Sequence, residues 1–160
     1  METEYTISEN EYVKANKLFT KPSKKLLVVY CLLITALLLI ALCFTNYILR
    51  FAAIGAIIGG IIGNILSRYV FAPVQTRKQY RVYQAAQESV IISAKPEGIN
   101  FRNSSGESII EWNKINKWRE NNEFLLIYQA PQVYNIIPKR IGVVSQNIRE
   151  LLQQNIGNAV

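Results

Sequence analysis

Residues 26–44 read LLVVYCLLITALLLIALCF, and Thr35 is the only clearly polar side chain among these nineteen residues. As a helix the run would be about 28 Å long, which is close to the hydrocarbon thickness of a bilayer. The core helix of a soluble protein rarely stays apolar on every face over such a length. A signal peptide fits less well, because four glutamates occur before the run and a second apolar run follows at once. We therefore expect a transmembrane helix at residues 26–44.

The second apolar run covers residues 48–70, and only Thr45, Asn46 and Tyr47 separate it from the first. So short a connection predicts a tight antiparallel membrane hairpin over residues 26–70. Basic residues flank the hairpin on its outer sides, namely Lys14, Lys17, Lys21, Lys24, Lys25, Arg68, Arg77, Lys78 and Arg81. At the other end of the hairpin the only basic residue is Arg50, near the start of the second run, so the positive-inside rule predicts that both termini are cytoplasmic.

Small residues repeat every four positions in the second run. Gly55, Gly59 and Gly63 form one row, and Ala52, Ala56, Gly60 and Asn64 form a second row beside it. Such rows let helix backbones approach closely. The groove either packs against the hairpin's own first helix, which we favour because the motif is frequent by chance, or it binds a second copy or another membrane protein.

The composition argues against an enzyme. The chain contains no histidine and no aspartate, so the usual acid–base groups and the commonest metal ligand are missing. We expect neither a metal nor a cofactor. The net charge of +7 reflects the membrane flanks, because residues 82–160 contain eight basic and seven acidic side chains. This balance also argues against a nucleic-acid partner.

Two segments adjoin the hairpin. Residues 1–25 are expected to form a cytoplasmic amphipathic segment, with Ser8 and Glu11 as a capping box and with Tyr12, Ala15 and Phe19 on one helical face. Whether this helix lies on the membrane or on the rest of the protein is open. Residues 71–88 predict a juxtamembrane helix that begins near Pro73.

Residues 89–160 predict an antiparallel α+β domain. Short alternating or β-branched segments at 89–93, 99–102, 108–112, 115–120, 124–129 and 135–137 are separated by polar turns, and Pro138 should end the last strand or lie at an edge. A final helix is expected to begin at Ser145 as its N-cap, and Val144, Ile148, Leu151, Leu152 and Ile156 form its apolar stripe. The pattern fits a pleckstrin-homology-like β roll that a C-terminal helix closes.

Three stretches carry a resemblance to a known family: GINFRNSSGESIIEWNKINKW at 98–118, FLLIYQ at 124–129 and IIPKR at 136–140. With the two apolar runs before them, they make the chain similar to the YcxB-like family of bacterial membrane proteins over nearly its whole length. The resemblance implies two N-terminal transmembrane helices and a C-terminal pleckstrin-homology-like domain, and it implies no reaction. In the family, Pro-Lys-Arg is usually followed by an aromatic or other large apolar residue and an acidic stretch. The segments Ile141-Gly142-Val143-Val144 and Ser145-Gln146-Asn147 depart from this pattern.

The candidate contact residues are basic. Lys139 and Arg140 follow a strand and could bind an anionic headgroup or an acidic partner, although solvation of a strand end is the simpler interpretation. Trp118 lies among Lys114 and Lys117 and is expected to be partly exposed, whereas Trp112 is expected in the core. Nearby glutamates make a solvated strand face the favoured interpretation for this group.

Together these features predict a membrane α-helical hairpin plus an α+β domain. We expect a non-catalytic, membrane-anchored interaction module at the cytoplasmic face of the bacterial inner membrane. Its basic flanks would contact anionic lipid, and its second transmembrane helix would contact a protein partner or another copy of the chain. The alternative is an immunity protein that protects the membrane against a cognate toxin.

Overall fold

The computed structural model describes residues 2–43 and 45–160. They form two compact units: residues 21–75 form the hairpin unit, while residues 1–20 and 76–160 together form the sheet unit. In sequence, the hairpin is therefore an insertion within the sheet unit. The predicted division, with residues 1–25 as a segment of their own, differs from this arrangement. The predicted end of the first span, Phe44, lies outside the described residues.

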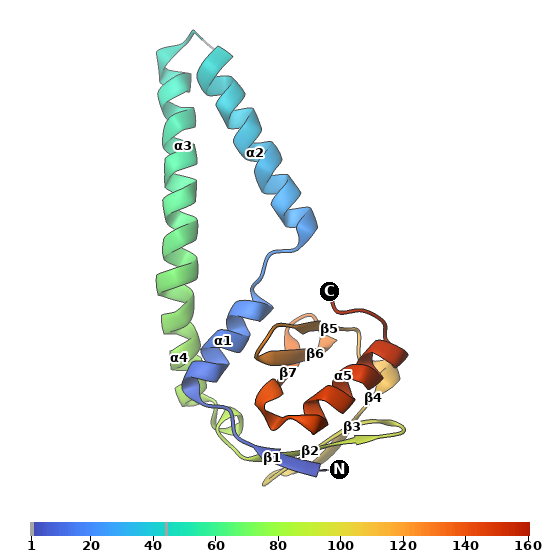
Figure 1. Cartoon of the computed structure of the whole chain (residues 1–160). Helices are drawn as coiled ribbons and strands as arrows, with labels where there is room; N and C mark the ends of the chain where they lie inside the picture. Colours follow the sequence, from blue (N-terminus) through green and yellow to red (C-terminus); the bar gives the residue numbers. More distant parts are fainter. Residues whose placement is uncertain (1, 44) are drawn as a thin grey trace. The chain divides into compact units, whose positions relative to one another are not determined.

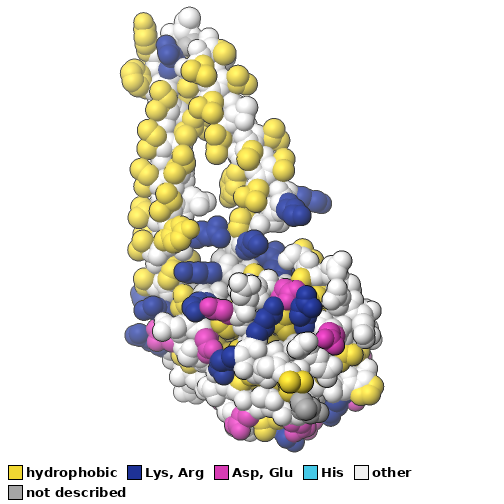
Figure 2. Space-filling model, viewed as in Figure 1, with side chains coloured by type: hydrophobic (Ala, Val, Ile, Leu, Met, Phe, Trp, Pro, Cys, Tyr) yellow, Lys and Arg dark blue, Asp and Glu magenta, His cyan; other side chains and the backbone are white. Residues whose placement is uncertain are grey.

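The hairpin unit contains helices α2 (Lys24–Cys43) and α3 (Tyr47–Leu66) (Figure 1). Both are long and apolar enough to cross a membrane: the mean hydropathy is 3.0 for Lys24–Cys43 and 1.9 for the continuous helix Tyr47–Val82. Only 6% of each apolar window is buried within the chain. Figure 2 shows hydrophobic side chains over the visible face of both helices. A core helix of a soluble protein would have most of these side chains covered.

The two helices meet close to their connection. The Asn46 side chain caps α3 by accepting a hydrogen bond from the Ile48 N–H at 2.9 Å. The Arg50 Nε donates to the Ala41 carbonyl oxygen at 2.9 Å, and the small side chains of Ala41 and Ala53 are buried at this point. From here α2 and α3 diverge (Figure 1). Arg50 thus satisfies a carbonyl group at the turn of the hairpin.

The glycine row of α3 does not pack against α2. A Cβ atom built on Gly55, Gly59, Gly60 or Gly63 would meet no other atom within 4 Å. The buried side chain of α3 near the hairpin turn is that of Ala53. Gly55, where the glycine row begins, is two positions further on and so lies about 200° around the helix, on the opposite face. The interpretation that the groove holds the hairpin's own first helix is therefore wrong. The second row (Ala52, Ala56, Gly60 and Asn64) is also exposed.

The second helix continues beyond the predicted span. A π-helical segment, η1 (Ser67–Phe71), joins α3 to α4 (Ala72–Val82), so Pro73 lies inside one helix and not near the start of a separate one. Proline lacks an N–H, and its ring crowds the carbonyl group four residues earlier, which is that of Tyr69. The wider π turn, in which the Ala72 N–H donates to the Ser67 carbonyl, relieves this crowding. A short 3-10 turn, η2 (Gln84–Ala86), follows α4.

The described part of the sheet unit contains two antiparallel sheets (Figure 1). The first has the order β1-β2-β3-β4, with β1 at Glu2–Tyr5, β2 at Val90–Lys95, β3 at Gly98–Asn103 and β4 at Gly106–Glu111. The second has the order β5-β6-β7, with β5 at Lys117–Glu120, β6 at Phe124–Ala130 and β7 at Val133–Pro138. The predicted antiparallel strands are confirmed, and β7 ends at Pro138 on the edge of its sheet.

Strand β1 pairs with β2, although the whole hairpin lies between them in the sequence. Glu2 lies opposite Ser93, and Tyr5 lies opposite Val90. Tyr5 is buried, and its hydroxyl donates to the Ile136 carbonyl oxygen of β7 at 2.9 Å, so β1 connects the two sheets. The sequence did not predict this strand, because the short stretch ETEY shows no apolar alternation.

Helix α1 (Glu9–Phe19) packs on the second sheet. The capping box of Ser8 and Glu11 is confirmed. Ala15 and Leu18 of the helix are buried in one cluster with Leu126 and its neighbours in β6. The amphipathic N-terminal helix therefore lies on the sheet unit, which decides the question that the sequence left open.

Helix α5 (Val143–Asn155) closes the main core. Val144, Ile148 and Leu152 are buried with residues of both sheets, which confirms these positions of the predicted stripe. Gly142 is the N-cap, with φ at 65°, so the predicted cap at Ser145 is wrong. Ser145 lies in the first turn, where its buried hydroxyl donates to the Gly142 carbonyl oxygen at 2.7 Å.

The two tryptophans take roles opposite to those expected. Trp118 is 1% exposed, and its Nε1 donates to the Gly157 carbonyl oxygen at 2.9 Å. Trp112 is only partly buried and lies in the 3-10 turn η3 (Trp112–Lys114). The expectation of an exposed Trp118 was wrong because side chains alternate along β5, so its charged neighbours lie on the other face of the strand. Trp118 is a core residue and not a contact surface.

A close approach between β3 and β4 requires glycine at position 98. A Cβ atom there would clash with the Ile110 carbonyl oxygen and lie 2.7 Å from its carbonyl carbon. Both are backbone atoms of the paired strand, so Gly98→Ala should cost about 2–3 kcal/mol of unfolding free energy. Thermal unfolding in detergent, followed by the near-ultraviolet signal of the tryptophans, measures this loss. Gly60→Ala, which has open space around it, is the control, and equal midpoints for the two variants would contradict the prediction.

Candidate functional site

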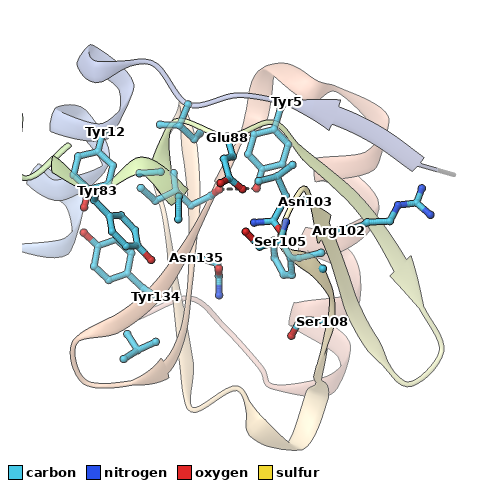
Figure 3. A pocket seen from close by; sticks show the side chains of 18 of the residues that line it. Tyr5, Tyr12, Tyr83, Glu88, Arg102, Asn103, Ser105, Ser108, Tyr134 and Asn135 are labelled. Carbon is cyan, nitrogen blue, oxygen red and sulfur yellow. Dashed lines mark hydrogen bonds between the residues drawn. The ribbon is translucent and has the colours of Figure 1, made fainter. Parts of the chain in front are cut away.

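An open groove of about 680 Å³ lies in the sheet unit (Figure 3). Its walls come from Tyr5 to Tyr12, from the segment between α4 and β2, from the end of the β3–β4 hairpin, and from the start of β7. These segments are far apart in the sequence, and the pairing of β1 with β2 brings the first two together. The volume falls in the range of pockets that hold small molecules or short peptide segments.

One end of the groove is aromatic. The side chains of Tyr12, Tyr83 and Tyr134 gather there (Figure 3). Tyr12 packs on Tyr80 with ring centroids 5.5 Å apart, and Tyr134 stacks on Phe19 at 4.7 Å. Burial raises the pKa of Tyr12 and of Tyr134, so both hydroxyls stay neutral near pH 7. This aromatic end offers apolar ring surface together with uncharged hydroxyl groups.

The other end of the groove is polar. Glu88 accepts a hydrogen bond from the Ser104 hydroxyl at 2.8 Å, and Asn103 accepts one from the Ser105 N–H at 3.1 Å. Arg102 also lines the groove but points away from its centre (Figure 3). Its guanidinium pairs with Glu2 at 3.1 Å. The polar end therefore presents an acidic group and no inward-pointing cation.

Several polar side chains in the groove have no partner. Ser108, Gln132 and Asn135 line it, and none of their side chains makes a hydrogen bond within residues 2–43 and 45–160. They supply both donors and acceptors. The same described residues contain no cluster of three or more potential metal ligands. The groove is thus suited to holding a ligand by ring contacts and neutral hydrogen bonds.

Strand β7 borders the groove with its edge. Five consecutive residues, 132–136, line the groove, whereas a strand that presents one face contributes alternate residues. β7 pairs with β6 on one side only. On its other side, the Ile136 carbonyl oxygen accepts the hydrogen bond from the Tyr5 hydroxyl, and no further backbone partner of this edge is found in the described chain.

The two chain segments that lead into and out of the hairpin are fastened together in the sheet unit. The Asn16 amide hydrogen-bonds to the Thr76 hydroxyl, and the Tyr80 hydroxyl donates to the Ile7 carbonyl oxygen at 2.7 Å. Glu9 pairs with Arg81 at 3.2 Å. These contacts hold α1 against the end of α4 and so fix the wall that carries Tyr12.

The predicted basic pair, Lys139 and Arg140, does not line the groove. The Arg140 Nε lies 2.6 Å from the Glu11 carboxylate, and its Nη2 donates to the Thr6 carbonyl oxygen at 2.7 Å. The hydrogen bond from Arg140 is the largest cause that lowers the pKa of Glu11 to about 2. Lys139 Nζ lies 2.7 Å from Glu120. Both side chains therefore hold parts of the sheet unit together.

The other predicted lysines lie elsewhere on the surface. Lys114 Nζ is 2.7 Å from Glu111, and both side chains are exposed. Lys117 Nζ lies 4.9 Å from the centroid of the Tyr128 ring, within the range of a cation–π contact. The structure does not bring either lysine into the groove. Glu120, which accepts hydrogen bonds from Lys139 and Arg149, has a lowered pKa chiefly because of the bond from Arg149.

The groove residues were not among the predicted site residues. Tyr83 falls within the predicted juxtamembrane helix of residues 71–88, Asn135 begins the predicted strand at 135–137, and Tyr134 belongs to no predicted element. The sole signal in the sequence was the number of tyrosines, nine in 160 residues. It could not locate the groove, because the groove depends on the pairing of β1 with β2.

Comparison with known proteins bears on the part of the chain that forms most of the strands and α5. The family model described as YcxB-like protein matches residues 95–154. The match includes the tryptophan segment and the Pro-Lys-Arg segment that carry the resemblance. No curated protein and no solved structure is significantly similar to the chain. Over residues 95–154, the chain is thus similar to the YcxB-like family.

Proposed function

We propose that the protein is a non-catalytic, membrane-anchored interaction module whose groove binds a segment of a partner protein. The observation that carries the proposal is the groove itself, with its aromatic end and its unpartnered Ser108, Gln132 and Asn135. Aromatic rings and neutral hydrogen-bonding groups are typical of surfaces that bind peptides. The absence of histidine and aspartate from the sequence supports a role without acid–base catalysis.

We also propose that the sheet unit is a pleckstrin-homology-like domain. The four-stranded and three-stranded antiparallel sheets and the closing helix α5 support this assignment. An anionic lipid headgroup is a poor ligand for the groove, because Arg102 is turned toward Glu2, Glu107 is paired with Lys95, and the carboxylate of Glu88 lines the wall. We expect lipid contact at the basic flanks of the hairpin instead.

In this proposal the sheet unit lies on the cytoplasmic side of a bacterial inner membrane. The flanking lysines and arginines support this orientation through the positive-inside rule. The hairpin connection at Thr45–Tyr47 would then face the opposite side.

Labelling of single cysteines tests the orientation. In a chain with Cys31→Ser and Cys43→Ser, Tyr47→Cys should react with a membrane-impermeant maleimide in cells whose outer barrier has been opened. Tyr83→Cys should react only after the membrane is permeabilised. The two positions are 73% and 60% exposed in the chain, so they form a matched pair. The opposite labelling pattern would refute the proposed orientation.

Photo-crosslinking in native membranes tests the groove. A photoreactive amino acid at Tyr83 should give a specific crosslinked product with another protein, because this exposed ring borders the groove. The control position is Val143, which is 65% exposed and does not line the groove. The Tyr83 product should fall at least tenfold when Asn135→Ala and Tyr134→Ala are combined in the same chain. Equal products from positions 83 and 143 would count against the groove as the binding site.

We propose the exposed glycine row as a second contact, for a membrane helix of another copy of this chain. The open space beside Gly55, Gly59 and Gly63 supports it, since helices approach closely where such rows are unfilled. A photoreactive residue at Gly59 should crosslink two copies, whereas one at Leu32, which is 65% exposed, should not. If neither position gives a crosslinked dimer, the proposed self-association is refuted. A crosslink at Gly59 to a toxin helix would instead favour the immunity function.

A further inference from the structure

We propose that the occupant of the groove is an extended segment of the partner protein, which pairs with the free edge of β7 as an additional strand of the second sheet. This inference rests on the proposed function and specifies the chemistry of the ligand: a main-chain strand rather than a helix, a proline-rich segment or a lipid headgroup.

The hydrogen bonds of β7 show which of its backbone N–H and C=O groups face the groove. In an antiparallel strand, the N–H and C=O of one residue point to the same side, and this side alternates along the chain. The Ile136 carbonyl accepts from the Tyr5 hydroxyl and so points away from β6. Two residues earlier, the N–H and C=O of Tyr134 must point to the same side. Lys139 is an odd number of residues from Ile136, so its N–H should point to the side of β6. It donates there to the carbonyl oxygen of Glu123, the residue before β6, at 2.7 Å.

An incoming strand would therefore meet the Tyr134 N–H and C=O and the Ile136 N–H. These groups are a ready template, because an unpaired sheet edge presents donors and acceptors at the spacing of another strand. The Tyr5 hydroxyl already binds the remaining carbonyl and marks the end of the free stretch. Pairing would begin at the β6–β7 turn and stop at Tyr5.

The rest of the groove fits the side chains of such a strand. Val90 and Phe101 supply apolar surface on the wall formed by the first sheet. Successive side chains of a strand point to opposite sides, so alternate residues would face this surface while the others would face solvent. The unpartnered amides of Gln132 and Asn135 can bind polar groups at the rim.

The charged side chains of the groove restrict the composition of the incoming strand. The groove carries the carboxylate of Glu88, which has no basic partner among the described residues, while Glu107 pairs with Lys95 and the guanidinium of Arg102 pairs with Glu2. An acidic segment would be repelled, so the expected strand is neutral or basic with alternating apolar residues. A helix would leave the free edge of β7 unpaired because its own N–H groups are bonded internally. A proline-rich segment lacks the N–H donors that the Tyr134 carbonyl requires.

The test uses phage-displayed random dodecapeptides, selected on the detergent-purified full-length chain. The strongest peptide is then made synthetically with one backbone N-methyl group at each position in turn. Strand addition predicts that methylation at every second residue weakens binding at least tenfold, while methylation at the residues between has less than a threefold effect. Uniform tolerance, or loss at consecutive residues, would overturn the proposal. Failure to enrich any peptide would also overturn it.

Variants of the protein provide a second readout. Tyr134→Pro removes the N–H that faces the groove and none that faces β6, so it should abolish peptide binding. Val143→Glu, on the exposed start of α5, should bind as the unaltered chain does. If Tyr134→Pro fails to fold, hydrogen exchange of the unaltered chain decides: peptide should slow the exchange of the Tyr134 and Ile136 amides at least tenfold. Unchanged exchange with bound peptide would rule out strand pairing.

The proposed interaction module and the proposed strand addition can be refuted independently. A specific photo-crosslink at Tyr83 without the alternating N-methyl pattern would keep the interaction module and refute the strand. Absence of the crosslink at Tyr83, together with no selected peptide, would refute the groove as a binding site altogether.

Discussion

The pairing of β1 with β2 is the constraint on which the sheet unit depends. These strands lie on either side of the hairpin in the sequence, yet they are hydrogen-bonded neighbours in the first sheet. The entropy of closing a loop grows only slowly with its length, so an inserted hairpin is tolerated when its two ends are held firmly. Tyr5, buried in the core and bonded to Ile136, provides such a hold. The ion pair of Glu11 and Arg140 supplies another between α1 and the end of β7.

The same constraint makes the groove a composite of segments that adjoin the hairpin. Tyr12 lies on α1 before it, and Tyr83 lies directly after α4. The bonds from Asn16 to Thr76 and from Tyr80 to Ile7 keep these two segments together. A change in the spacing of α1 and α4 would therefore move two of the three tyrosines at the aromatic end. The third, Tyr134, is fixed by its stacking on Phe19 and stays with the second sheet.

The parts of the fold that sequence periodicity predicted are those in which neighbours along the chain determine the structure. The hairpin helices, the strands after residue 89 and the apolar stripe of α5 all follow from local patterns. Strand β1 was missed because its partner is remote and its own pattern is uninformative. Trp118 was misplaced because charged neighbours were taken as a sign of exposure, although alternation places them on the other face. The glycine row was expected to pack against α2, but α3 turns Ala53 to the buried side and leaves the glycines open.

Ion pairs engage most of the basic side chains after residue 82, whereas several of those that flank the hairpin have none among the described residues. In the sheet unit, Lys95, Lys139, Arg102, Arg140 and Arg149 each form an ion pair with a glutamate. Exposed pairs add little stability, but those of Arg102 with Glu2 and of Lys95 with Glu107 neutralise charged side chains that line the groove. Lys17, Lys24, Lys25, Arg68 and Lys78, by contrast, form no ion pair among the described residues. In the proposed function, attraction to anionic lipid would fall to these flanks of the hairpin, and the groove would select its ligand by shape and neutral hydrogen bonds.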